Sequence, residues 1–148
     1  MSISKVSGET ITAAFGGGYA LQGSLTTAEF NPVSSTTYYG GDANNGSAGA
    51  TGAQSRRIYI PKTGTIKFCY GLFYGVAQAT SSVGTLSINV NNGAYTTIGT
   101  ATHLTAHSLY SNTGLSISVT RGDYIEFKWV SPFYVPQRIT QDFIIYIE

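Results

Sequence analysis

The two histidines, His103 and His107, are the residues whose spacing most readily suggests chemistry. On a helix, two histidines four positions apart share a face and can bind a metal ion together. Here their neighbours are typical of strands, and the same spacing along a strand separates two side chains by about 13 Å. No cysteine or carboxylate lies near them in the sequence. We therefore expect loop or surface histidines and no metal site.

The tripeptide Arg121-Gly122-Asp123 has two possible roles. An exposed Arg-Gly-Asp sequence can support integrin-like adhesion, but Gly and Asp are also typical turn residues. Because the motif stands between two strand patterns, we expect a turn. Glu126 and Lys128 alternate on the strand that follows and are expected to form a solvated or interface pair.

The remaining signatures of catalysis are missing from the sequence. It has no Gly-x-Ser-x-Gly elbow, no phosphate loop and no paired carboxylates, and Gly16-Gly17-Gly18 neither follows a strong strand pattern nor precedes a helix. The single cysteine, Cys69, stands among apolar residues, which favours a buried or interface thiol over a reactive one. We expect a protein that is not an enzyme and has no cofactor.

Recognition of a glycan or a protein is better supported, because Tyr rings stack on sugars while amides form hydrogen bonds. Asn91, Asn92 and Tyr95 surround one expected hairpin, and His107 and Tyr110 stand in a broken segment over residues 101–112. These five are the candidate ligand-binding residues. The alternative is that they are structural, as Tyr in β proteins often is at an edge or interface.

The composition limits the class of protein. The 148 residues suit one domain, and only 10% are charged against roughly 25% in average soluble domains. A net charge of +1 without a basic run argues against nucleic acid as a partner. No apolar stretch is long enough for a signal peptide or a membrane span, so we expect synthesis in a cytoplasm and no membrane insertion.

Alternating apolar residues predict an all-β chain. The pattern is strongest over residues 114–130, where a strand, the Arg-Gly-Asp turn and an aromatic-rich strand predict a hairpin. Asn-Gly at 92–93 predicts a second hairpin. The closing strand, apolar on both faces, is expected in the centre of a sheet. About eight strands and no helix indicate an antiparallel sandwich or barrel. Strands are expected near 36–39, 56–60, 65–74, 85–90, 95–100, 115–120, 124–130 and 143–147.

Three segments of the sequence occur in a characteristic order: residues 60–66 (IPKTGTI), 86–93 (LSINVNNG) and 118–125 (SVTRGDYI). Together they resemble the jelly-roll heads of the tumour necrosis factor and complement-head type, as found on phage fibres, spikes and spore-surface filaments. The resemblance covers about residues 32–148. It implies a jelly-roll sandwich at 28–148, preceded by an N-terminal arm or connector at 1–27, and a compact homotrimer with aromatic side chains along its threefold axis.

The chain has more strand aromatics than one small sandwich can easily bury. The surplus is expected at the trimer interface. The candidate interface residues are Phe68, Tyr70, Phe73, Tyr74, Phe127 and Trp129.

The resemblance, without a signal peptide or a collagen-like stem, implies a viral structural protein of a bacteriophage: the trimeric head of a spike, fibre or capsid decoration on the virion surface. Its expected partners are other virion proteins and a glycan or protein of the host surface. The alternative is a stand-alone carbohydrate-binding module or lectin.

Overall fold

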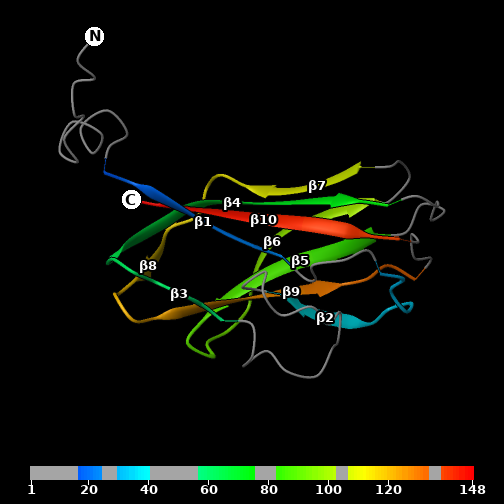
Figure 1. The fold of residues 1–148 in the computed structure, drawn as a ribbon, viewed down its shortest axis with the longest axis horizontal. Helices are drawn as coiled ribbons and strands as arrows, with labels where there is room; N and C mark the ends of the chain where they lie inside the picture. The colour runs from blue at the N-terminus through cyan, green and yellow to red at the C-terminus, as the bar shows by residue number, and fades with distance from the viewer. Residues whose placement is uncertain (1–16, 25–29, 41–56, 76–82, 103–106, 134–137) are drawn as a thin grey trace, which may run out of the picture.

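The computed structural model of the chain describes residues 17–24, 30–40, 57–75, 83–102, 107–133 and 138–148. These residues form two antiparallel sheets that lie face to face (Figure 1). Sheet 1 has the order β1-β10-β4-β7, with β8 also paired to β4. Sheet 2 has the order β2-β9-β5-β6, with β3 also paired to β9. The strands are β1 (Tyr19–Ser24), β2 (Thr37–Gly40), β3 (Ile58–Tyr59), β4 (Gly64–Tyr74), β5 (Val83–Val90), β6 (Thr96–Thr102), β7 (His107–Asn112), β8 (Ile117–Val119), β9 (Tyr124–Val130) and β10 (Thr140–Ile147).

The strand order is that of a jelly roll. The first strand pairs with the last, β2 and β3 pair with β9, β4 pairs with β7 and β8, and β5 pairs with β6. Ten segments thus fill eight strand positions, because β2 with β3 and β7 with β8 each share one partner strand. The chain winds inward along both sheets and then outward again, as in two Greek keys. The expected all-β jelly-roll sandwich is confirmed.

The core is an aromatic cluster between the two sheets. The ring of Phe73 on β4 lies 4.9 Å from that of Trp129 on β9 and 4.8 Å from that of Tyr110 on β7. Phe127 and Phe143 stack with their centroids 4.2 Å apart. All five side chains are fully buried. The sandwich therefore has its largest rings in its own interior, where each ring contributes its large apolar area.

An irregularity at Lys67 changes which side chains of β4 face the core. Ile147 pairs with Ile66 while its neighbour Tyr146 pairs with Phe68, so Lys67 is an extra residue in the ladder. Such a bulge reverses the alternation beyond it. Ile66 is consequently buried, whereas Phe68, Tyr70 and Leu72 lie on the opposite, outer face. Uninterrupted alternation over residues 65–74 predicts that these four residues share one face, and the bulge is the reason why that prediction is wrong.

Residues 114–130 do not form the predicted hairpin. The strand β8 pairs with β4 in sheet 1 and β9 belongs to sheet 2, so the Arg-Gly-Asp turn carries the chain from one sheet to the other. The turn pairs with residues 60–63 instead: Gly122 N–H donates to Ile60 O at 2.9 Å and Ile60 N–H donates to Asp123 O at 2.8 Å. Gly122 has φ +94°, which a glycine adopts without strain.

The hairpin predicted at Asn-Gly is confirmed by the pairing of β5 with β6, but its turn is centred on Asn91-Asn92 and not on Asn92-Gly93. Asn91 and Asn92 have φ of 51° and 59°, and Gly93 N–H donates to Val90 O at 2.8 Å. Positive φ at both central residues is the type I′ geometry, whose twist matches that of the flanking strands. The closing strand β10 is also where it was expected, in the centre of sheet 1 between β1 and β4.

The sandwich begins before residue 28. Residues 19–24 form β1, which pairs with β10 from Tyr19 opposite Ile147 to Ser24 opposite Asp142. The predicted arm therefore does not extend to residue 27, and residues 1–16 lie outside the described part of the chain. The weak alternation of β1 concealed it in the sequence, since a strand on the edge of a sheet needs few large apolar residues.

Candidate functional site

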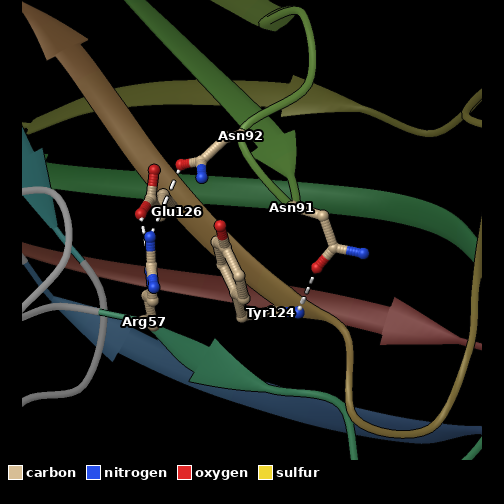
Figure 2. A network of polar contacts seen from close by, with 5 residues as sticks. All are labelled: Arg57, Asn91, Asn92, Tyr124 and Glu126. Carbon is tan, nitrogen blue, oxygen red and sulfur yellow. Dashed lines mark hydrogen bonds and ion pairs between the residues drawn. The ribbon is translucent and has the colours of Figure 1, made fainter.

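A polar and aromatic cluster occupies the outer face of sheet 2, near the end of the sandwich that holds the Asn91-Asn92 turn (Figure 2). Arg57 comes from the residue before β3, and Tyr124 and Glu126 from β9. Tyr59 belongs to β3, and Asn91 and Asn92 form the turn after β5, so three separate segments bring six polar side chains to one place. We call Arg57, Tyr59, Asn91, Asn92, Tyr124 and Glu126 the outer cluster.

An ion pair stands at the centre of the outer cluster. Arg57 Nε donates to Glu126 Oε1 at 3.0 Å, and the guanidinium carbon lies 3.8 Å above the ring of Tyr124. Glu126 is 2% exposed and Arg57 20%, so the carboxylate is nearly enclosed although it is on the outward side of β9. The pKa of Arg57 is raised, first by the hydrogen bond to Glu126. The guanidinium thus has a fixed position and a compensated charge.

Glu126 does not form the pair with Lys128 that alternation suggested. The ammonium of Lys128 lies 3.9 Å from the ring centroid of Tyr95, a cation–π contact. Burial raises the pKa of Tyr95 to about 12, and the nearby charge of Glu126 adds to the shift. Tyr95 remains half-buried against Lys128, at one side of the outer cluster.

Asn91 is a structural link between two turns. Its Oδ1 accepts from Tyr124 N–H at 3.0 Å, and its Nδ2 donates to Asp123 Oδ1 at 2.6 Å. The second oxygen of Asp123 accepts from Thr120 N–H at 2.7 Å. These bonds, first that from Thr120, lower the pKa of Asp123. Both carboxylate oxygens of Asp123 thus accept hydrogen bonds that stabilise the turn. This supports a structural role for the Arg-Gly-Asp motif over a role in adhesion.

Asn92 and Tyr59 are the accessible members of the outer cluster. Asn92 is exposed, and its Oδ1 accepts a long, 3.5 Å hydrogen bond from Arg57 Nη2. Tyr59 is 61% exposed, and its ring meets that of Tyr124 edge-on at 6.0 Å. The candidates drawn from the sequence included Asn92 but missed Arg57, Tyr59 and Tyr124. The sequence did contain a signal for two of them. Arg57 and Tyr59 alternate with Ile58 and Ile60, and this pattern places Arg57 and Tyr59 on the outward face of the strand.

The other candidate ligand-binding residues, His107 and Tyr110, do not lie in the outer cluster. His107 lies on sheet 1, with its ring 5.0 Å from that of Tyr74. Tyr110 is fully buried, because β7 is a regular strand whose Ser108 and Tyr110 point inward. It therefore cannot meet a ligand at the surface, and the expected broken segment is a strand from residue 107. His103 lies outside the described residues.

The predicted trimer-interface residues fall into two groups, one inside the sandwich and one on its surface. Phe73, Phe127 and Trp129 are fully buried within one chain, so they are not available to a neighbouring subunit. Phe68, Tyr70 and Tyr74 lie on the outer face of sheet 1, beyond the Lys67 bulge. Alternation shows which residues share a face, but it does not tell whether that face meets the opposite sheet or another molecule.

Apolar side chains gather on the outer face of sheet 1, beside the polar side chains of His107, Thr140 and Asp142. Among the described residues, it carries Leu72 on β4, Leu109 opposite it on β7, and Ile144 on β10, which are 43%, 57% and 41% exposed. Phe68 stacks on Tyr146 with a centroid distance of 4.8 Å, and Tyr74 is 39% exposed. We call this surface the sheet 1 apolar face. It consists of Phe68, Tyr70, Leu72, Tyr74, Leu109, Ile144 and Tyr146.

Within the described ranges, no three metal-ligating side chains of His, Cys, Asp or Glu gather into a group. The same ranges contain no helix that could cross a membrane.

Comparison with protein-family models and with curated proteins finds no match. Among solved structures, the chain is similar to the Eiger tumour necrosis factor of S. frugiperda, at 11% identity over 88% of this chain and 92% of that one, with a TM-score of 0.47. It is also similar to the C-terminal CBM6 of LamC, a marine laminarinase from Zobellia galactanivorans, at 17% identity over 88% of this chain and 100% of that one, with a TM-score of 0.36.

Proposed function

We propose that this protein is the trimeric jelly-roll head of a spike, fibre or capsid decoration on a virus particle, and that the virus is a bacteriophage. The head acts by binding rather than by catalysis, and it attaches the particle to the host surface. The observation that carries the proposal is the sheet 1 apolar face, whose exposed apolar side chains would be covered by association with identical subunits.

The sheet 1 apolar face supports association of identical subunits. Of the eight large hydrophobic side chains that are exposed among the described residues, four (Leu72, Tyr74, Leu109 and Ile144) lie on this one face. A contiguous apolar patch of this kind marks an interaction surface in soluble proteins. A closed ring around a rotation axis covers such a face on every subunit at once. The number three comes from the resemblance to the tumour necrosis factor heads.

The virion location rests on the resemblance to phage fibre and spike heads and on the composition. A surface with few charges and many Ser, Thr, Asn and Gly residues suits a protein that is covered by neighbours in a particle. Other virion proteins are the proposed partners besides the two identical subunits.

The test is the solution mass by light scattering, measured for the whole chain and for a version that starts at Gly17. The shorter version keeps β1, which pairs with β10 along its length. A threefold mass for both places the assembly in the sandwich, as proposed. A single-chain mass for both overturns the trimer, and a threefold mass for the whole chain alone transfers the assembly to residues 1–16.

A stand-alone carbohydrate-binding module is the second candidate, and the outer cluster favours it. That cluster has an exposed ring, an amide and a guanidinium side by side, which is chemistry for sugar recognition. A single-chain mass together with measurable affinity for a free sugar would favour this candidate over the virion head.

A further inference from the structure

We propose that the outer cluster is a binding site for a neutral saccharide, with Tyr59 as the stacking platform and Arg57 and Asn92 as hydrogen-bonding groups. This inference rests on the attachment role proposed above and deepens it. It places recognition on sheet 2, on the side of the sandwich away from the sheet 1 apolar face.

The platform is the ring of Tyr59. It is 61% exposed on the short strand β3, which pairs with β9. The ring of Tyr124, directly opposite in register, meets it edge-on at an interplanar angle of 65°. The exposed ring has an apolar face and a polar hydroxyl, which together suit the apolar face and the hydroxyl rim of a pyranose.

The hydrogen-bonding groups are next to the platform in the fold. Arg57 is two residues before Tyr59, so both side chains leave the same face of the strand. Arg57 Nε donates to Glu126, and Nη2 makes the long bond to Asn92 Oδ1. A guanidinium has five N–H donors, so further donors remain for a ligand. The amide of Asn92 offers both a donor and an acceptor. A sugar hydroxyl also donates and accepts, so this mixed set matches a pair of neighbouring hydroxyls.

The charge balance of the outer cluster favours a neutral sugar over an acidic one. An anionic sugar is recognised by a cation whose charge is not already compensated. Within the outer cluster, Arg57 is the one cation and is paired with Glu126 at 3.0 Å, whereas Lys128 lies outside the cluster, over the ring of Tyr95. A carboxylate brought to Arg57 would therefore also meet Glu126, and the neutral hydroxyl is the better partner.

The cluster is organised before any ligand arrives. Glu126 and the Tyr124 ring hold Arg57, and the type I′ turn holds the backbone of Asn92 with φ 59°. Groups that are already fixed lose little conformational entropy on binding, which improves affinity without adding contacts. Glu126 and Tyr124 are thus positioning residues, whereas Tyr59, Arg57 and Asn92 contact the sugar.

The experiment is a glycan array with neutral gluco-, galacto-, manno- and fuco-oligosaccharides beside sialylated and uronic-acid forms, probed with the whole protein. The best neutral glycan is then titrated by NMR into wild type and variants. We expect Tyr59→Ala to weaken binding about tenfold or more and Asn92→Gly several-fold; glycine keeps the turn because it tolerates positive φ. Arg57→Lys retains the charge but loses the planar fork, and should also weaken binding.

Phe133→Ala is the matched control, because this ring is 65% exposed and lies outside the outer cluster. It should bind as wild type does. Binding to no neutral glycan, binding confined to acidic glycans, or binding that Tyr59→Ala and Asn92→Gly leave intact would each overturn the inference. Light scattering on the same samples keeps the two proposals apart: a threefold mass without sugar binding overturns only this site, and sugar binding by a single chain overturns only the trimer.

Discussion

The indole Nε1 of Trp129 donates a hydrogen bond to the hydroxyl of Tyr110 at 2.9 Å, across the interior of the sandwich. The two residues come from opposite sheets, β9 and β7, and both side chains are fully buried. The bond therefore joins the sheets by a polar contact within an apolar core. Because Trp129 is the only tryptophan, its fluorescence also reports on the packing of this core.

Tyr110→Phe should destabilise the protein, because it removes the acceptor of the buried indole N–H without altering the shape of the ring. Loss of one partner of a buried hydrogen bond costs about 1–3 kcal/mol. Urea unfolding followed by Trp129 fluorescence measures the change. An unchanged midpoint would show that the hydroxyl contributes nothing to the free energy of unfolding.

Gly71→Ala should also destabilise the fold. A Cβ at Gly71 would lie 2.5 Å from Leu86 Cδ2 and 3.3 Å from Phe143 Cδ1, between the two sheets. Forcing a methyl group into a packed core costs roughly 1–3 kcal/mol. The control is Gly114→Ala, where the nearest atom would be 3.7 Å away. The two variants are compared by the same urea unfolding, and equal midpoints would contradict the prediction.

Leu109→Lys and Ile144→Lys should convert the proposed trimer to single chains. Each puts a charge into the sheet 1 apolar face, and burying an unpaired charge in an interface is unfavourable. Val33→Lys is the control, because Val33 is 64% exposed but lies before β2, away from this face. Light scattering gives the mass and circular dichroism the strand content. A threefold mass in the first two variants would place the interface elsewhere.

The stability of the protein should fall in acid partly through Asp123. Its folded-state pKa is lowered by Thr120 and then by Asn91. Its contribution is therefore fully present above the unfolded-state pKa of about 4 and is lost as the pH falls through the lower folded-state pKa. Asp123→Asn should reduce the difference between urea midpoints at neutral pH and near pH 2, and Asn91→Ala should reduce it in part. The same difference in all three proteins would contradict this assignment.

Cys69 should resist thiol reagents in the folded protein. The side chain is fully buried, and desolvation raises the pKa of the thiol to about 12. The reactive thiolate is therefore scarce at neutral pH. A colorimetric disulfide reagent should label Cys69 only as urea unfolds the chain, in step with Trp129 fluorescence. Rapid labelling in buffer would indicate that the core opens locally.

The fold could be predicted from the sequence wherever one strand has one buried face. Ile125, Phe127 and Trp129 alternate with Tyr124, Glu126 and Lys128, and the three apolar residues are buried as the period of two requires. The Asn91-Asn92 turn was predictable for a local reason, since few residues other than Asn and Gly accept positive φ. Both features depend on residues that are close together in the sequence, so they can be recognised from the sequence alone.

What the sequence concealed depends on partners distant in sequence. The Lys67 bulge exists only in relation to Tyr146 and Ile147, so no pattern within β4 reveals it. The Arg-Gly-Asp turn has the residues of a hairpin, but its amides bond to residues 60–63 and it becomes a crossover. The candidate site could be predicted only at Asn91 and Asn92, because Arg57 gains its position from Glu126, 69 residues later.

The pairing of Tyr19 with Ile147 brings the beginning of β1 and the end of β10 together. Both lie at the same end of the sandwich, and the end of β9 and the beginning of β10 lie at the other (Figure 1). A fluorescent label or affinity handle joined before β1 and another joined after β10 would therefore stand side by side, close enough for energy transfer between them. Cargo carried there would leave the end of β9 and the beginning of β10 uncovered at the opposite end of the sandwich.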